Sequence, residues 1–185
     1  MAKDRVERDE EDLVRLYLTD IGQYTLLTKD DEVRLAKLIE SGKEAAEALE
    51  KAGKDITAAK KRELRRAARE GEDAQQAFVQ SNLRLVVSIA KKYQASGLPL
   101  LDLIQEGNIG LMKAVSKFDP TKGARLGYYA SWWIRQSIIR AVESQCRTIR
   151  IPIYKLEVVN KVHQTQKDMF QELGREPTME EVALR

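Results

Sequence analysis

Apolar residues recur at helical spacing along most of the chain, in segments separated by Gly and Pro. The spacing predicts helices over residues 12–22, 28–42, 74–95, 100–115, 125–148 and 154–173. Thr28 and Asp31 have the spacing of an N-cap pair, and Thr178 and Glu181 form a capping box that opens a further helix. Few Gly and Pro residues argue against a fold of many short strands. We therefore predict an all-α fold, a compact helical bundle with flanking helices.

Residues 43–72 interrupt this pattern, because Ala, Lys, Glu and Arg dominate and large apolar residues nearly vanish. Gly42 is expected to close the preceding helix, and the stretch is interpreted as a spacer or a loosely packed excursion. The predicted organisation is a disordered N-terminus (1–10), a short helical region (11–42), the spacer (43–72), a central domain (73–152) and a final helical segment (153–185). The last predicted helix makes barely two turns, which indicates that the sequence is part of a longer chain.

Composition narrows the function classes. The 185 residues carry a net charge of +3, with 43% hydrophobic and 33% charged residues, which makes global disorder improbable. Cys146 and His163 are the single residues of their kinds, so a disulfide framework and the common zinc sites are excluded. No signal peptide, membrane span or nucleotide-binding loop is present, and no carboxylate sits in an obviously apolar setting. We expect a cytoplasmic protein that is not an enzyme, with no cofactor, no metal and no membrane partner.

Basic and aromatic residues interleave over residues 121–150. The segment has six basic residues and one acidic residue, Glu143, a local net charge of +5, and it holds both tryptophans. Wound as a helix, Tyr129, Trp133, Gln136, Arg140, Glu143 and Arg147 fall on one face, and Ile134, Ile138, Ala141, Val142 and Gln145 fall on another that can pack. Cations that follow phosphates and rings that stack on bases suit single-stranded nucleic acid. The alternative, buried tryptophans and solvated arginines, is equally open at this point.

A smaller polar group comes from residues 100–115. Asp102, Gln105 and Glu106 share one face of the predicted helix, either as a solvated face or as a surface that docks a protein. Gly107 and Gly110 lie inside the same apolar pattern, where two glycines permit close helix packing or a local bend.

Three longer segments carry a resemblance to a known family. Residues 82–86 (NLRLV), 101–111 (LDLIQEGNIGL) and 129–136 (YASWWIRQ) resemble domain two of bacterial sigma factors of the sigma-seventy family. Residues 174–178 (GREPT) resemble the start of domain three, and residues 12–42 resemble the short region before domain two. The resemblance implies a transcription initiation factor that binds core RNA polymerase and promoter DNA. It further implies that domain two recognises and melts the minus-ten element by capturing flipped bases of the non-template single strand.

The resemblance also implies roles for residues. Docking on the clamp helices of the beta-prime subunit falls to Asp102, Gln105, Glu106 and Asn108. The resemblance and the basic and aromatic segment together give the candidate DNA-binding residues. These are Tyr17, Leu18, Asn82, Phe118, Lys122, Arg125, Tyr128, Tyr129, Trp132, Trp133, Arg135, Gln136, Ile139, Arg140, Tyr154 and Glu157.

The chain departs from the family pattern at three places. In residues 124–128 (ARLGY), one of the aromatic residues and the Ser/Thr hydroxyl groups of the family pattern are missing. Ile139 stands where the family often has Thr, and Tyr154 stands where many members have His. These differences leave open whether the chain is a housekeeping or an alternative member. Two other classes remain as alternatives: a protein-interaction module that binds polymerase without active DNA recognition, and a helical RNA-binding domain.

Overall fold

The computed structural model describes residues 2–51, 57–147 and 149–185, with side chains from Asp12 onward. The described residues form α-helices and two short 3-10 helices and contain no strand, which confirms the all-α prediction. The chain divides into two compact units, Met1–Ile139 and Arg140–Arg185. No helix within the described ranges is long and apolar enough to cross a bilayer.

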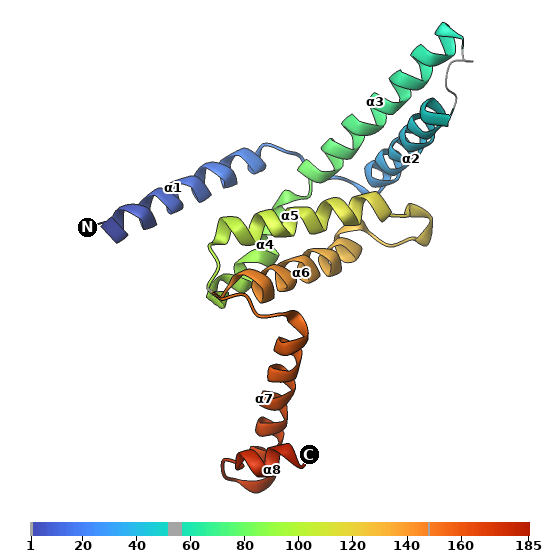
Figure 1. Ribbon diagram of the computed structural model, residues 1–185. Helices are drawn as coiled ribbons and strands as arrows, with labels where there is room; N and C mark the ends of the chain where they lie inside the picture. Colours follow the sequence, from blue (N-terminus) through green and yellow to red (C-terminus); the bar gives the residue numbers. More distant parts are fainter. Residues whose placement is uncertain (1, 52–56, 148) are drawn as a thin grey trace. The chain divides into compact units, whose positions relative to one another are not determined.

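The first unit contains most of the helices (Figure 1). In chain order they are α1 (Ala2–Gly22), α2 (Lys29–Lys51), α3 (Ala58–Gln80), α4 (Leu83–Ala90), η1 (Lys91–Ser96), α5 (Leu100–Lys117), η2 (Pro120–Lys122) and the larger part of α6 (Leu126–Gln145). Helix α1 begins at Ala2, where the sequence indicates a disordered N-terminus, because extending an existing helix costs less than nucleating one. The predicted domain boundaries stay predictions.

Helices α2 and α3 form an extensively packed hairpin (Figure 1). The expectation that Gly42 closes the first helix is wrong, because α2 continues to Lys51. A Cβ atom on Gly42 would lie 2.6 Å from the Cα atom of Gly71, so the two backbones touch at this point. Ala45 and Ala74 are buried along the same hairpin. Within residues 43–51 and 57–72 the hairpin therefore docks through small residues, which corrects the expectation of loose packing for these two described stretches.

The apolar pattern over residues 74–95 is divided rather than continuous. Helix α3 ends at Gln80 and α4 begins at Leu83. At the break, the Asn82 side-chain amide Nδ2 donates to the Phe78 carbonyl oxygen at 2.8 Å. A carbonyl that would otherwise lack its helical partner is thereby satisfied, which stabilises the end of α3.

The core of the first unit lies where α3, α4, α5 and α6 meet. Fully buried side chains include Phe78, Val86, Leu103, Ile104, Leu111, Leu126, Ile134 and Ile138. A Cβ atom on Gly107 would lie 2.6 Å from Val86 Cγ1, and one on Gly110 would lie 2.7 Å from the Trp133 carbonyl oxygen. The prediction that these two glycines permit close helix packing is therefore confirmed.

The second unit consists of the end of α6, α7 (Ile153–Leu173) and α8 (Met179–Ala183). Along α6, Ala141 is buried, Val142 is half-buried and Gln145 is exposed, so the predicted packing face ends before Gln145. Thr148 lies outside the described residues.

Both predicted caps are confirmed: Asp31 N–H donates to Thr28 Oγ1 at 3.3 Å, and Thr178 and Glu181 form a reciprocal capping box.

Candidate nucleic-acid interface

A chain of aromatic rings runs through the first unit from α3 to α6. Successive ring centroids are 5.9 Å apart for Phe78 and Phe118, 6.4 Å for Phe118 and Tyr129, and 6.2 Å for Tyr129 and Trp133. Trp132 meets Trp133 at 5.1 Å with the ring planes at 90°. The Phe118–Tyr129 pair is tilted at 40° and the other three pairs are edge-to-face, and aromatic pairs favour such geometries over face-to-face stacking. The buried end of this chain therefore supports its exposed end on α6.

The two tryptophans have different environments. Trp132 is 57% exposed and Tyr128 is 85% exposed, whereas Trp133 and Tyr129 are half-buried. The Lys117 ammonium lies 4.8 Å from the centre of the Trp133 ring, close enough for a cation–π contact. The sequence left a buried and an exposed tryptophan pair equally open. The structure separates them, with Trp132 presented outward and Trp133 behind it.

A pocket of about 560 Å³ opens between these exposed rings on α6. Its lining consists of Ala124, Tyr128, Tyr129, Ser131, Trp132 and Arg135. Ser131 Oγ donates to the Gly127 carbonyl oxygen at 2.6 Å, so this hydroxyl is already engaged within the helix. Aromatic faces and one guanidinium are thus the chemical groups available to a ligand. They fit stacking and phosphate contacts better than a dense hydrogen-bond readout.

The turn before α6 is held by its own polar contacts. Asp119 Oδ1 accepts hydrogen bonds from the Thr121 backbone N–H at 2.9 Å and from the Thr121 hydroxyl at 2.6 Å. These bonds from Thr121 lower the pKa of the Asp119 carboxyl below its ordinary value. Gly123 follows with φ of 73°, a backbone conformation that favours glycine. The turn keeps Phe118 half-buried and leaves Lys122 exposed.

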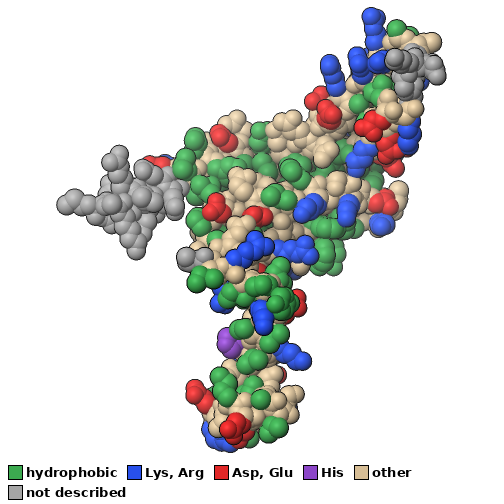
Figure 2. Space-filling view, in the orientation of Figure 1, with side chains coloured by type: hydrophobic (Ala, Val, Ile, Leu, Met, Phe, Trp, Pro, Cys, Tyr) green, Lys and Arg blue, Asp and Glu red, His purple; other side chains and the backbone are tan. Residues whose placement is uncertain are grey.

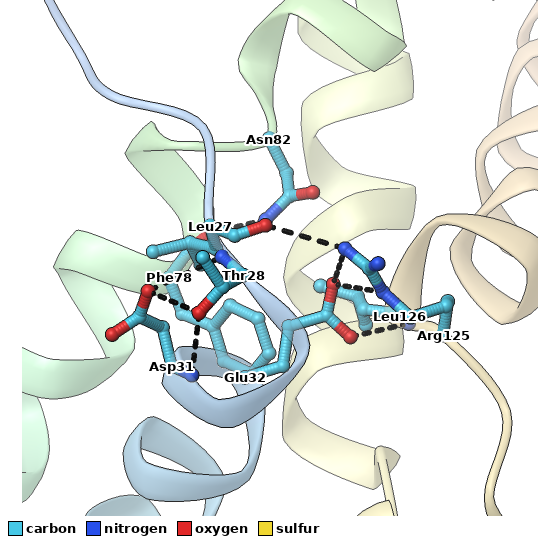
Figure 3. Close-up of polar contacts among 8 residues, drawn as sticks. All are labelled: Leu27, Thr28, Asp31, Glu32, Phe78, Asn82, Arg125 and Leu126. Carbon is cyan, nitrogen blue, oxygen red and sulfur yellow. Dashed lines mark hydrogen bonds and ion pairs between the residues drawn. The ribbon is translucent and has the colours of Figure 1, made fainter.

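The first turn of α6 is attached to α2 through a buried carboxylate (Figure 3). Glu32 is 5% exposed, and its Oε1 accepts a hydrogen bond from Arg125 Nε at 3.0 Å. Its Oε2 accepts the backbone N–H of Leu126 at 3.1 Å. Leu126 is the first residue of α6, so Glu32 satisfies one of the N–H groups that a helix start leaves unpaired. Sequence reasoning missed Glu32, because no local pattern distinguishes it from its exposed neighbours.

Arg125 is a structural partner of this carboxylate. Besides the contact with Glu32, its Nη2 donates to the Leu27 carbonyl oxygen at 3.2 Å, which attaches the segment before α2 (Figure 3). Its guanidinium charge is therefore largely compensated within the protein. A role of Arg125 in DNA binding stays a prediction.

A second exposed surface lies on α5. Asp102 and Gln105 are exposed, and Glu106 and Asn108 are half-buried. Ile109 and Met112 continue the same helical stripe and are 42% and 48% exposed. Sequence reasoning did not single out these two apolar residues. The available signal was the spacing of three, four and three residues that joins them to Asp102 and Gln105.

The structure brings Tyr17, a predicted DNA-binding residue, to this second surface. Asn108 Nδ2 donates to the Tyr17 hydroxyl oxygen at 3.3 Å, which connects α5 to α1. Leu18 is half-buried on α1, and the Asn82 amide is occupied by the Phe78 carbonyl. On α6, Gln136 and Arg140 are exposed and Ile139 is half-buried. Tyr154 and Glu157 are exposed on α7 of the second unit.

Comparison with known protein families gives matches over two stretches of the chain. Residues 78–148 match the family model of sigma-70 region 2, and residues 12–45 match that of sigma-70 factor, region 1.2. The RNA polymerase sigma factor SigA of Lactococcus lactis subsp. cremoris is 47% identical over 172 residues, covering 93% of this chain and 40% of that protein. The RNA polymerase principal sigma factor HrdC of Streptomyces coelicolor is 49% identical over 181 residues, covering 96% and 53%.

The chain belongs to the sigma-70 family. It spans about half the length, or less, of the curated relatives it matches. The two matched regions of this sigma-70 chain meet at defined contacts: Glu32 of the first bonds Arg125 and Leu126 of the second, and Tyr17 bonds Asn108. Between the stretches that match the two family models, residues 46–51 belong to α2 and residues 58–77 to α3.

Proposed function

We propose that this sigma-70 chain acts in transcription initiation, without enzymatic chemistry, by binding core RNA polymerase and by recognising and melting the promoter minus-ten element. The observation that carries the proposal is the α6 pocket, where the exposed rings of Tyr128 and Trp132 lie beside Arg135. This pocket falls in the stretch that matches sigma-70 region 2. The names of the relatives, RNA polymerase sigma factors, support polymerase as the partner.

Strand opening then follows from binding alone. Flipping one base out of a duplex costs a few kcal/mol, and stacking a base on an aromatic side chain returns roughly 1–3 kcal/mol. Capture of one or two non-template bases by Tyr128 and Trp132 therefore offsets much of the cost of opening. Because Trp133 contacts the Trp132 ring and is itself in contact with Tyr129, little further ordering of Trp132 is needed when a base arrives.

Charged and amide groups beside the pocket would hold the rest of the element. Lys122 and Arg135 are exposed cations suited to phosphates, and Gln136 is an exposed amide suited to a base edge. We assign Asn82, Tyr17 and Leu18 to the downstream side of the element on the family resemblance. Arg140, Tyr154 and Glu157 are assigned to its upstream side on the same ground.

The α5 surface is proposed as the polymerase contact, with the beta-prime clamp helices as its partner. Ile109 and Met112 form a small exposed apolar centre, and Asp102 and Gln105 extend the stripe as its polar edge. An apolar centre with a polar rim is the usual organisation of a protein interface. This surface is separate from the α6 pocket residues, so the two contacts can be made together.

Binding of the chain to single-stranded DNA tests the proposal. We expect a labelled non-template minus-ten oligonucleotide to bind at least about tenfold more tightly than a scrambled one, a difference of about 1.4 kcal/mol. Trp132→Ala should remove that preference. Polymerase binding with no preference between the two oligonucleotides would favour the protein-interaction module. Tighter binding of the RNA version than of the DNA version would favour an RNA-binding domain.

A further inference from the structure

The outer part of α3 carries a concentration of positive charge. Between residues 60 and 69 there are six basic residues, Lys60, Lys61, Arg62, Arg65, Arg66 and Arg69, and one acidic residue, Glu63. The local net charge is 6 − 1 = +5, which exceeds the +3 of the whole chain. All seven side chains are exposed. Figure 2 shows Lys and Arg side chains projecting from this end of the hairpin.

Three of these arginines share one face. Arg62, Arg65 and Arg69 are three and four residues apart, so they form a single stripe, here called the arginine surface. The buried residues of α3 are Gly71, Ala74 and Phe78, which helical geometry puts on the opposite side. The arginine surface therefore points away from the packed side of the helix.

Neighbouring acids make ion pairs with other basic residues of this helix. Lys60 pairs with Glu63 at 2.9 Å and Arg66 with Glu70 at 2.7 Å. Within the described part of the chain, no acidic side chain lies at ion-pair distance from Arg62, Arg65 or Arg69. Arg65 and Arg69 are four residues apart, as are Arg62 and Arg66, and like charges at that spacing destabilise a helix. Helix stability therefore does not explain the pattern.

The residue type and the position both indicate phosphate. Arginine presents a planar fork of donors that matches phosphate oxygens, which a surface kept only for solubility does not require. The last turn of the same helix contains Phe78, the first ring of the aromatic chain that leads to α6. At about 1.5 Å per residue, the arginine surface begins about 14 Å and ends about 24 Å along α3 from Phe78. At about 3.4 Å per base pair, that range equals about four to seven base pairs.

We propose that Arg62, Arg65 and Arg69 form a phosphate-contacting surface for duplex DNA that flanks the single strand held by α6. The proposal rests on the proposed function for the single strand held by α6 and for the identity of that DNA as promoter. The contact is independent of base sequence, because the guanidinium groups meet the sugar–phosphate backbone. Its contribution to affinity falls steeply as salt concentration rises. The close contact between Gly42 and Gly71 packs α3 against α2.

The test measures the salt dependence of DNA binding by the full 185-residue chain. Three labelled probes share one single-stranded minus-ten segment: one has no duplex, one has an upstream arm and one has a downstream arm, each arm about 12 base pairs long to exceed the span on α3. The variant is Arg62→Gln with Arg65→Gln and Arg69→Gln. The matched control is Lys29→Gln with Lys37→Gln and Lys51→Gln, which removes three exposed charges from α2 of the same hairpin.

We plot the logarithm of the association constant against the logarithm of the salt concentration. For one of the armed probes, the slope should be steeper than for the unarmed probe by about two to three, since each phosphate contact adds about 0.9. The arginine variant should lose this increment, whereas the control should keep it. A variant with Arg62→Lys, Arg65→Lys and Arg69→Lys, which retains the three charges, should keep most of it. Scrambling the single strand should not remove the increment. An equal slope for the variant and the unchanged chain on both armed probes overturns the proposal. Loss of polymerase binding with unchanged DNA slopes overturns it as well, in favour of an acidic protein partner.

Failure of the proposed function gives a different result. In that case the minus-ten and scrambled single strands bind equally, whatever the arm-dependent slope. A circular-dichroism melt of the arginine variant and of the α2 control checks that the hairpin remains folded, which Gln favours as a good helix former.

Discussion

Glu32 and Arg125 are 93 residues apart in sequence, yet Glu32 Oε1 accepts a hydrogen bond from Arg125 Nε at 3.0 Å. The carboxylate also bonds the first backbone N–H of α6, so one buried acid from α2 determines where the helix with the aromatic pocket begins. Breaking a buried charge pair leaves polar groups without partners, which costs more than losing an exposed pair.

Glu32→Ala should therefore lower the free energy of unfolding by about 2–4 kcal/mol, less than a fully buried pair because Arg125 is partly exposed. Urea denaturation of the chain measures the change. Glu40→Ala, an exposed acid of the same helix, serves as the control and should change stability by less than about 0.5 kcal/mol. Equal effects of the two substitutions would show that the Glu32 contact contributes nothing specific.

Trp132 and Ile134 should separate binding from folding. Trp132 is largely exposed, so Trp132→Ala should leave stability nearly unchanged and weaken single-strand binding by about 1–3 kcal/mol. Ile134 is fully buried, so Ile134→Ala should lower the free energy of unfolding by about 2–5 kcal/mol. Thermal melting and fluorescence anisotropy test both substitutions. If Trp132→Ala melts as early as Ile134→Ala, Trp132 is a core residue.

Ile109 and Met112 should contribute to polymerase binding. Their replacement together by Ala removes the apolar centre of the α5 surface, and we expect a loss of at least about 1–2 kcal/mol in affinity for core polymerase. Leu13→Ala with Leu16→Ala removes exposed apolar residues from α1 and serves as the matched control. Unchanged affinity of the α5 variant, measured by titration with labelled chain, would place the polymerase contact elsewhere.

Ile139 should weaken discrimination at the upstream edge of the minus-ten element. An isoleucine offers a methyl surface and no hydrogen bond, in contrast to the Thr that is frequent in the family. Ile139→Thr should therefore sharpen the preference among templates that carry each of the four upstream bases. Transcription from the four templates gives the comparison, with Ile139→Val as the control without a hydroxyl. The same preference in both variants would mean that residue 139 does not face a base.

The second unit should respond to acid at its capping box. Hydrogen bonds from Arg175, and then from the Thr178 backbone, lower the pKa of Glu181 from its ordinary 4.5 to about 2. The stabilisation from a depressed carboxyl pKa is complete above the ordinary value and is lost as pH falls through the folded value. Protection of the α8 amides, relative to their intrinsic exchange rate at each pH, should therefore stay constant down to about pH 4 and fall toward pH 2. Glu181→Gln should remove this pH dependence, and a persisting dependence would assign it to another group.

Local signals in the sequence were sufficient for the fold class and for the helix caps. Thr28 with Asp31 and Thr178 with Glu181 were predicted correctly, because each cap is made by residues three positions apart. The sigma-70 resemblance was likewise correct, because its segments are long and contiguous. Gly42 was misjudged, because a glycine that ends a helix and a glycine that touches another helix look the same in sequence.

The aromatic and basic composition of residues 121–150 is sufficient to predict the candidate interface. Which tryptophan faces outward was decided only when α6 packed, because its buried stripe of Ile134 and Ile138 sets the rotation of the helix. The engagement of Arg125 by Glu32 and of Asn108 by Tyr17 also came from tertiary structure. Helical periodicity depends on neighbours within one turn, whereas these contacts join helices that are distant in sequence, and no local pattern carries that information.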